Sequence, residues 1–390
     1  MYLSHLNLTN FRNFINLTVE LPNGLTVFHG CNAQGKSTLM EAIYILAIGK
    51  SFRANNESEV INWDASNRRE GTIIDGRAKT TDSILRIIIG YDSLTRDVPS
   101  SNIQQDTLSP ITRRHIKING ISQPISELVG QLNAVLFSAE DIDLVTGSPS
   151  VRRRYLDILI SQIDRNYLRA LGTYQHTLIQ RNRLLKLISE GRATKEELHF
   201  WNQQLVKEGT YVLRKRVSTV ETLKELSRKN HKELTGGSED LSMRYLSSFP
   251  IPQDISQIDN VFNSTLEDNY QKDITARVTG YGPQRDDVRL MVNGVNMRKY
   301  SSRGQARTIA LALRLGEASY ITKIRGEQPI LLLDDILSEL DPTRRSKVME
   351  KALSTDQSII TTTDLSYIKE SAVTKASTFQ VDNGKLYQQI

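Results

Sequence analysis

The spacing of hydrophobic and polar residues changes three times along this chain. Residues 2–28 alternate between apolar and polar side chains, which predicts short, half-buried strands. The same alternation returns at 85–91 and, around an Asn-Gly turn, at 115–121. The polar stretch 92–110 between them has the composition of an exposed loop. We therefore expect residues 50–140 to be largely β.

A helical spacing replaces this alternation over residues 148–234. Ser148 suits an N-cap and Pro149 suits the first helical position. Apolar residues then recur three and four positions apart, with a glycine turn at 190–192. A polar, glycine-containing stretch at 236–256 has the composition of an exit loop. We expect three or four helices that form an inserted arm.

The last third of the chain returns to a mixed pattern. A hairpin is predicted at 288–295, a helix at 305–315 and a buried strand at 330–333. The chain is thus predicted to be an α/β protein whose nucleotide-binding head is split by a helical arm. The predicted parts are the N-terminal head, 1–147, the arm with its exit loop, 148–270, and the C-terminal head, 271–390.

A glycine-rich stretch lies between a predicted strand at 25–29 and a predicted helix at 37–48. It matches the P-loop pattern G-x-x-x-x-G-K-[ST]. In that setting backbone N–H groups bind phosphates, Lys36 reaches the β and γ oxygens, and Ser37 holds Mg²⁺. We therefore predict that the chain binds ATP or GTP. The residues expected to bind it are Gly30, Cys31, Asn32, Ala33, Gln34, Gly35, Lys36, Ser37 and Thr38.

A second apolar run, 329–333, ends in two carboxylates, as a Walker B strand does. Asp334 is predicted to hold Mg²⁺. Asp335 is predicted to polarise the attacking water and, with Lys36, to be catalytic. Lys36 and Asp334 are 334 − 36 = 298 residues apart, which is far more than one strand crossover needs.

Composition adds limits to this reading. The 390 residues exceed one ordinary compact domain. With 50 basic and 44 acidic residues the net charge is +6, which suits a polyanionic partner without establishing one. Cys31 is the only cysteine, which excludes an internal disulfide or a cysteine-zinc cluster. With no signal-peptide pattern and no apolar run of membrane length, we expect a cytoplasmic protein with no membrane partner.

The split nucleotide site resembles the ABC-type ATPase heads of chromosome-maintenance and repair proteins. Residues 302–305 resemble the core of the ABC signature, and 338–341 resemble the D-loop. The resemblance implies that Ser302, Gly304 and Gln305 bind the γ-phosphate held by the other subunit of a dimer, with Asp341 at the seam. Two features depart from transporter ATPases. Asp335 replaces their catalytic glutamate, and their switch histidine is absent, so that Thr362 and Thr363 are the candidates for its place.

More specific blocks resemble the RecF family. That resemblance implies an ATP-dependent, DNA-binding homodimer that acts in recombinational repair and replication-fork maintenance. It also implies RecO and RecR as partners in loading RecA, and double-stranded, gapped or junction DNA as the ligand. Because Asp335 replaces a glutamate, we expect a weak, DNA-stimulated ATPase that works as a switch. The blocks are 8–14, 32–36, 49–53, 137–141, 147–154, 282–287 and 302–305.

Basic residues at the start of the arm are the candidates for contact with DNA phosphates. Phe11, Phe14 and Trp201 are interpreted as core residues. Contact of Arg12, Gln34 or Glu140 with nucleotide is left open. The DNA candidates are Arg152, Arg153, Arg154, Arg165, Arg169, Arg181, Arg183 and Lys186.

Two other functions compete with this reading. The ATPase subunit of an ABC transporter would account for the P-loop, signature and Walker B, but not for the helical arm or the missing histidine. A non-enzymatic DNA clamp with a vestigial nucleotide site would account for the basic arm. The intact Lys36, Ser37, Asp334 and Asp335 argue against it.

Overall fold

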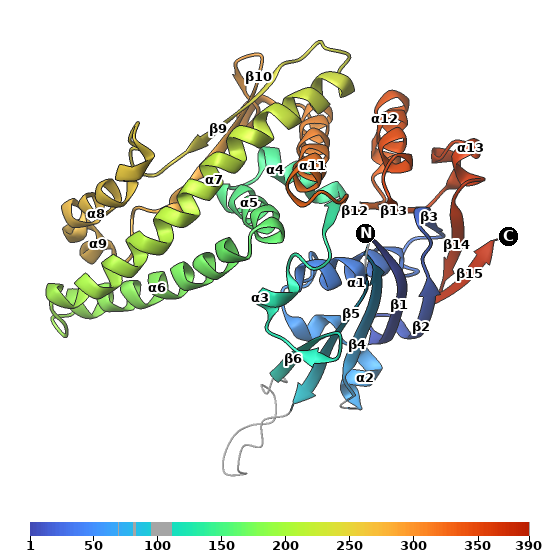
Figure 1. The fold of residues 1–390 in the computed structure, drawn as a ribbon, viewed down its shortest axis with the longest axis horizontal. Helices are drawn as coiled ribbons and strands as arrows, with labels where there is room; N and C mark the ends of the chain where they lie inside the picture. The colour runs from blue at the N-terminus through green and yellow to red at the C-terminus, as the bar shows by residue number, and fades with distance from the viewer. Residues whose placement is uncertain (69, 81–82, 95–110, 390) are drawn as a thin grey trace. The chain divides into compact units, whose positions relative to one another are not determined.

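The computed structural model describes residues 1–68, 70–80, 83–94 and 111–389 of the chain, and it divides into two compact units (Figure 1). We call residues 1–140 with 321–390 the head unit, and residues 141–320 the arm unit. The arm had been predicted to span 148–270. In the structure the hairpin at 287–296 packs with the arm helices, so the compact unit continues to residue 320. The predicted division into functional parts at 1–147, 148–270 and 271–390 stays a prediction.

The head unit contains two sheets. In the described residues the first sheet has the strand order β2-β1-β4-β5-β6-β7 and is antiparallel throughout. Its strands are β1 (Tyr2–Phe11), β2 (Phe14–Glu20), β4 (Thr72–Lys79), β5 (Ile84–Leu94), β6 (Ile111–Ile118) and β7 (Ile121–Ser122). The hairpin predicted at 115–121 is confirmed by β6 and β7. Residues 92–94 of the predicted loop belong to β5, and 95–110 lie outside the described residues.

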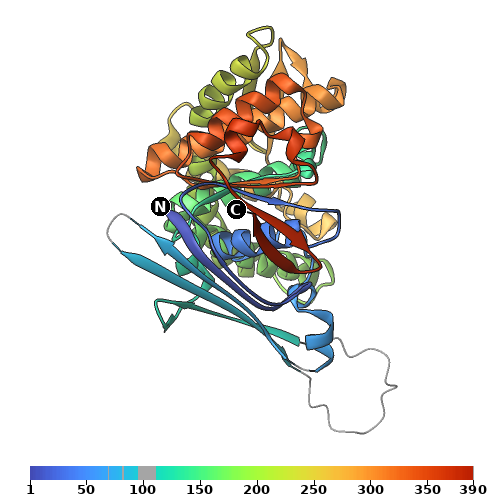
Figure 2. The same ribbon diagram turned by 90° about the vertical axis from the view of Figure 1, so that its right-hand side faces the viewer.

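The second sheet carries the strands of the nucleotide site. Its order is β15-β14-β3-β13-β12-β8 in the part of the chain that is described, and only β15 runs antiparallel to its neighbour. Figure 2 shows the β14–β15 hairpin in dark red at one edge. The strands are β3 (Gly24–His29), β8 (Ala134–Phe137), β12 (Ile330–Asp334), β13 (Gln357–Thr362), β14 (Ser377–Asp382) and β15 (Lys385–Gln389).

Helix α1 (Lys36–Ile48) contacts strands of both sheets (Figure 1). It is buried on nearly every side, because apolar residues surround its axis instead of forming one stripe. Phe11 and Phe14 are fully buried, so the core role predicted for them is confirmed. The other head helices are α2 (Trp63–Asn67), α3 (Ile125–Leu128), α12 (Pro342–Leu353) and α13 (Glu370–Val373).

Long helices dominate the arm unit. α6 and α7 pack side by side as an antiparallel pair joined by a short connection, in which Gly191 has a φ of 70° (Figure 1). The prediction of a helical stretch over 148–234 is confirmed. Trp201 is half-buried against Leu184, Leu185 and Leu198. The unit's helices are α4 (Asp143–Thr146), α5 (Pro149–Ile163), α6 (Arg165–Ser189), α7 (Leu198–Leu234), α8 (Ile258–Asp268), α9 (Tyr270–Ala276), α10 (Met297–Tyr300) and most of α11 (Arg303–Arg325).

The expected exit loop at 236–256 was partly wrong. It contains β9 (Leu241–Leu246), which pairs antiparallel with β10 (Asp287–Val292), and β10 turns back into β11 (Val295–Asn296). The sequence did not reveal β9 for two reasons. Its alternation covers only six residues among glycine, serine and proline, and its partner strand is more than forty residues away in sequence. The hairpin predicted at 288–295 and the strand predicted at 330–333 are confirmed.

Candidate nucleotide site

The order of the parallel strands brings the two halves of the predicted site together. β13 lies between β3 and β12, and all three run in the same direction. The carboxyl ends of these strands, at His29, Asp334 and Thr362, therefore meet at one edge of the sheet. The parallel pairing of β3 with β13 and of β13 with β12 thus brings residues about 300 positions apart in sequence into one site.

The loop between β3 and α1 needs its glycines. Gly30 has a φ of 147°, and an added Cβ would lie 2.4 Å from the carbonyl oxygen of Val381. Gly35 has a φ of 117°, and a Cβ there would lie 2.6 Å from the side chain of Asn13. Both positions combine a left-handed backbone with a close neighbour, so a larger side chain would displace the loop. Glycine at these two positions thus permits the backbone conformation that leads the loop into the N-terminus of α1, where phosphates can bind.

Lys36 spans this loop. Its ammonium donates hydrogen bonds to the carbonyl oxygens of Gly30 and Cys31, each at 2.7 Å. Desolvation by burial lowers the pKa of Lys36, while the nearby carboxylates of Asp335 and Asp334 oppose that shift. The ammonium is thus held in place before any phosphate binds, and its hydrogen bonds can pass to phosphate oxygens.

Ser37, Asp334 and Thr361 form a chain of hydrogen bonds between the Walker segments. The Ser37 hydroxyl donates to Asp334 Oδ1 at 2.9 Å, and the Thr361 hydroxyl donates to the same oxygen at 2.7 Å. A hydroxyl and a carboxylate in contact are the hard oxygen ligands that Mg²⁺ takes. Among the described residues, no group of three or more His, Cys, Asp or Glu side chains is placed to hold a metal ion, so phosphate and water oxygens would complete the coordination.

Asp335 has the features of a strained catalytic carboxylate. Its φ is 50°, and its Oδ1 is buried without a hydrogen-bond partner among the described residues. Its backbone N–H donates to the hydroxyl of Thr361 at 2.9 Å, which fixes the turn. Desolvation raises the pKa of Asp335, with Lys36 opposing and Asp334 adding to the shift. A backbone hydrogen bond from Thr363 acts against this shift. A carboxylate with one oxygen unsatisfied beside the P-loop lysine is suited to accept a proton from water.

The sequence analysis did not name Thr361; it named Thr362 or Thr363 for the place of the switch histidine, and that assignment stays a prediction. Thr362 is fully buried, and its hydroxyl donates to the carbonyl oxygen of Asp364 at 2.9 Å. Thr363 is exposed. Thr361 instead bonds to Asp334 and to the backbone of Asp335, so it is the threonine that joins both acids. Successive strand residues point to opposite faces of a sheet. Which of the threonines reaches Asp334 therefore depends on how β13 pairs with β12, and the sequence alone does not give that pairing.

The remaining P-loop positions differ in what they offer. Cys31 and Asn32 are exposed, Ala33 has a φ of 64°, and Thr38 is buried in the first turn of α1. The Gln34 side chain accepts from the backbone N–H of Asn383 at 2.6 Å and donates to the carbonyl oxygen of Asn32. The side chain of Gln34 thus links the loop to the β14–β15 hairpin. The backbone of Gln34 is therefore the part of this residue that is a candidate for phosphate binding.

Arg12 lines the same pocket as Lys36, and its guanidinium makes two hydrogen bonds to Glu41, at 3.0 and 2.7 Å. The Glu41 side chain has 0% exposure, and it also accepts a hydrogen bond from Ser51. A fully buried glutamate within the P-loop helix therefore sets the orientation of Arg12. Sequence analysis gave no signal for Glu41, because its partner is 29 positions away.

The signature residues belong to the arm unit and form a reciprocal cap at the start of α11. The Ser302 hydroxyl accepts from the backbone N–H of Gln305, and the Gln305 side chain accepts from the backbone N–H of Ser302, each at 3.2 Å. Ser302 and Gly304 are both exposed. A serine hydroxyl at the exposed start of a 23-residue helix is a ready anion-binding group.

Asp341, the predicted D-loop residue, is the N-cap of α12 in the head unit. Its carboxylate accepts from the backbone N–H groups of Thr343 and Arg344, each at 3.1 Å. Desolvation acts to raise the pKa of Asp341, but these N–H groups and the Arg344 guanidinium lower it overall. The carboxylate is exposed and ionised at neutral pH.

The predicted DNA-contacting residues fall into two groups. Arg152 and Arg181 are buried, and each is paired with an aspartate, Asp287 and Asp273 respectively, so the prediction that they contact DNA is wrong. Both lie at helix positions that face the core of the arm unit. The sequence did not distinguish these two arginines from the exposed basic residues around them. Arg153 is half-buried and donates to the carbonyl oxygen of Asp286. The exposed candidates are Arg154, Arg165, Arg169, Arg183 and Lys186.

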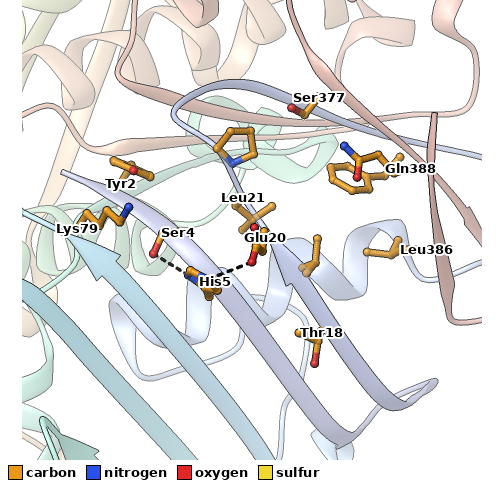
Figure 3. A pocket seen from close by; sticks show the side chains of 13 residues that line it. Tyr2, Ser4, His5, Thr18, Glu20, Leu21, Lys79, Ser377, Leu386 and Gln388 are labelled. Carbon is orange, nitrogen blue, oxygen red and sulfur yellow. Dashed lines mark hydrogen bonds and ion pairs between the residues drawn. The ribbon is translucent and has the colours of Figure 1, made fainter. Parts of the chain in front are cut away.

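A second cavity of the head unit has different chemistry. It measures about 580 Å³ and lies between β1, β2 and the β14–β15 hairpin (Figure 3). His5 lies 2.9 Å from Ser4 and 3.5 Å from Glu20, and these side chains line the cavity with Lys79 and Tyr2. The cavity has no phosphate-binding loop and no pair of carboxylates, so we assign the nucleotide to the P-loop pocket.

The chain was compared with known proteins. The RecF/RecN/SMC N-terminal domain model matches residues 2–386. DNA replication and repair protein RecF of Herpetosiphon aurantiacus is 37% identical over 99% of this chain and 100% of the relative. The RecF of Bacillus velezensis is also 37% identical, with the same coverage. These matches do not support the transporter alternative.

Two solved structures support the fold class predicted from the sequence. The recombination mediator protein RecF with ATP, of the RecFOR pathway, is 33% identical, with a TM-score of 0.87 over 100% of this chain and 98% of that one. An SMC head bound to ScpA shares the fold alone, at 15% identity and a TM-score of 0.54. The predicted ABC-type head with a helical arm is confirmed. In the described part of the chain, no helix is both long and apolar enough to cross a membrane; the cytoplasmic location stays a prediction.

Proposed function

This chain belongs to the RecF family of DNA replication and repair proteins and is an ATP-binding ATPase of the ABC/SMC type; from that premise we propose that ATP closes it into a dimer that holds DNA. The observation that carries the proposal is the contact between Ser37 and Asp334, which joins the two Walker segments. Slow hydrolysis would then open the dimer, so that the ATPase acts as a switch.

The chain's own residues divide the work on ATP. The N–H groups of the loop at 30–37 and the Lys36 ammonium bind the β and γ phosphates. A Mg²⁺ held by Ser37 and Asp334 would neutralise charge on the phosphate oxygens. Asp335 accepts a proton from the attacking water, and Thr361 holds both aspartates in place.

The second half of each site comes from a second copy of the chain. Ser302 presents its hydroxyl at an exposed helix start, and Asp341 presents an ionised carboxylate. Neither would complete a site alone, since each ABC site is closed by two subunits. A ligand that meets both copies only in the closed state shifts the monomer–dimer equilibrium by its difference in binding energy.

DNA binds through its phosphates in this proposal. The exposed basic residues of α5 and α6 provide modest charges along the arm, and contacts of that kind position a duplex without reading its sequence. DNA would in turn stimulate the weak ATPase by favouring the closed dimer. The RecFOR pathway named for the related RecF structure makes RecO and RecR the partners proposed for this chain.

We expect the mass of the protein in solution to double when Mg²⁺ and ATP are added, as measured by light scattering. Lys36→Met removes the ammonium that bridges the loop and should weaken ATP binding on the order of a hundredfold, or about 3 kcal/mol. This variant should stay a monomer with ATP and lose ATP-dependent binding of duplex DNA.

Lys207→Met, at an exposed position of α7, is the matched control and should behave as the unmodified protein. A constant monomer that still binds both ATP and duplex DNA would mean that nucleotide does not control assembly, and the switch would have to be given up.

A further inference from the structure

Trp63 is an exposed aromatic residue beside the phosphate-binding loop. Its side chain is 80% exposed, although it lines the same pocket of about 470 Å³ as Lys36, Ser37 and Asp335. A large apolar ring kept in water at the wall of a binding pocket is a candidate for contact with a ligand. The nucleotide chemistry assigned above uses only the phosphate-binding groups and leaves this ring without a role.

The backbone that carries Trp63 is firmly anchored. Asn62, directly before it, caps α2 by accepting from the N–H groups of Asp64 and Ala65. The backbone N–H of Asn62 donates to the carbonyl oxygen of Asn10 at 2.8 Å, and its side chain donates to the backbone of Arg12. The indole is thus mounted on a turn that is tied to the end of β1, as a pre-organised platform would be.

The two walls of the pocket match the two parts of a nucleotide. The loop and the start of α1 provide backbone N–H groups and Lys36 for phosphates. The segment 53–63 provides the aliphatic side chain of Ile61 and the ring of Trp63. A purine base is flat and weakly polar, so an aromatic face is the surface on which it stacks.

We propose that the indole of Trp63 is the stacking platform for the purine base of the nucleotide whose phosphates bind at 30–37. The inference rests on the proposed binding of ATP at that loop. Stacking is tolerant of the kind of base, because every base has an aromatic face. Trp63 therefore adds affinity for a nucleoside over bare phosphates, and it does not select adenine over guanine.

Trp63→Ala is expected to weaken binding of ATP, ADP and GTP alike by on the order of tenfold. It should leave binding of tripolyphosphate, which has no base, unchanged. Trp63→Phe keeps an aromatic face and should retain most of the nucleotide affinity. Calorimetric titration of the full chain measures all four ligands.

The chain also provides an optical test, because it has two tryptophans, Trp63 and Trp201. With Trp201→Phe, the fluorescence of Trp63 should change on titration with ADP, which lacks the γ-phosphate needed for dimer closure. With Trp63→Phe, the remaining Trp201 lies in the arm unit and should give no change.

The outcomes separate this inference from the proposed function. Normal ADP binding by calorimetry, with no change in Trp63 fluorescence and no loss of affinity in Trp63→Ala, would overturn the stacking role alone. An equal loss of affinity for tripolyphosphate would also overturn it, because Trp63 would then support the loop. Absence of nucleotide binding by the unmodified protein would instead refute the proposed function.

Discussion

Replacing Asp335 with asparagine is expected to slow ATP hydrolysis by about 10²- to 10⁴-fold, the usual contribution of a general base. The buried Oδ1 of Asp335, which lacks a partner among the described residues, becomes an oxygen or nitrogen that cannot accept the proton of water at neutral pH. ATP binding should change little, because Lys36 and Ser37 remain. A hydrolysis assay at saturating ATP, with ATP affinity measured separately, checks both parts.

The same substitution should raise stability at neutral pH. The pKa of Asp335 is raised by desolvation, so the folded protein favours the protonated carboxyl. That contribution to stability is fully present below the pKa of the unfolded chain and is lost as pH rises through the higher pKa of the folded protein. Asp335→Asn should therefore melt at a higher temperature than the unmodified protein at pH 7, and the difference should shrink as the pH is lowered.

Asp268→Asn, on the exposed side of α8, serves as the control for both measurements and should change neither. Hydrolysis by Asp335→Asn at the rate of the unmodified protein would show that another group activates the water. A lower melting temperature at pH 7 would show that the charge of Asp335 stabilises the fold, contrary to the raised pKa.

Replacing Arg181 with alanine should destabilise the protein by about 3–5 kcal/mol, the cost of leaving a buried charge without its partner. The Arg181 side chain has 0% exposure and that of Asp273 has 2%, and their hydrogen bond measures 2.8 Å. Arg181 also donates to Asn202 of α7 and to Thr279 in the segment after α9, so truncation breaks these bonds as well. Urea unfolding of the full chain measures the loss.

Arg183→Ala lies two residues away on the exposed side of α6 and is the matched control. Its stability should stay within about 0.5 kcal/mol, while its affinity for duplex DNA should fall slightly at low salt. If Arg181→Ala kept its stability and lost DNA binding instead, Arg181 would belong to the surface first predicted for it.

The sequence was sufficient where the chemistry is local. The P-loop, the paired carboxylates at the end of β12 and the signature serine each lie within one short segment, and the spacing of residues within each segment identifies the motif. Helices α5, α6 and α7 could be predicted because an apolar stripe of helical period repeats over many residues. The family resemblance added the expectation of a dimer, which stays a prediction.

The features that were missed depend on pairing between distant segments. Thr361 meets Asp334 only because β13 lies next to β12, and Glu41 meets Arg12 only after α1 packs against the first sheet. Arg181 reads as a surface residue in sequence, and only its contact with Asp273, 92 positions away, makes it part of the core. A one-dimensional pattern gives periodicity but not the partner of a buried charge.

The shared site is tested most directly by Ser302→Arg, with ATP affinity and mass in solution measured on the same sample. Ser302 is exposed, and its loss as a helix cap costs only about 1 kcal/mol, so the monomer should fold. Ser264→Arg, on the exposed surface of α8, adds the same charge elsewhere. We predict that Ser302→Arg binds ATP as tightly as the unmodified monomer but does not dimerise. Ser264→Arg should bind ATP and should also dimerise. ATP-driven dimerisation of Ser302→Arg would contradict a nucleotide site shared between two copies.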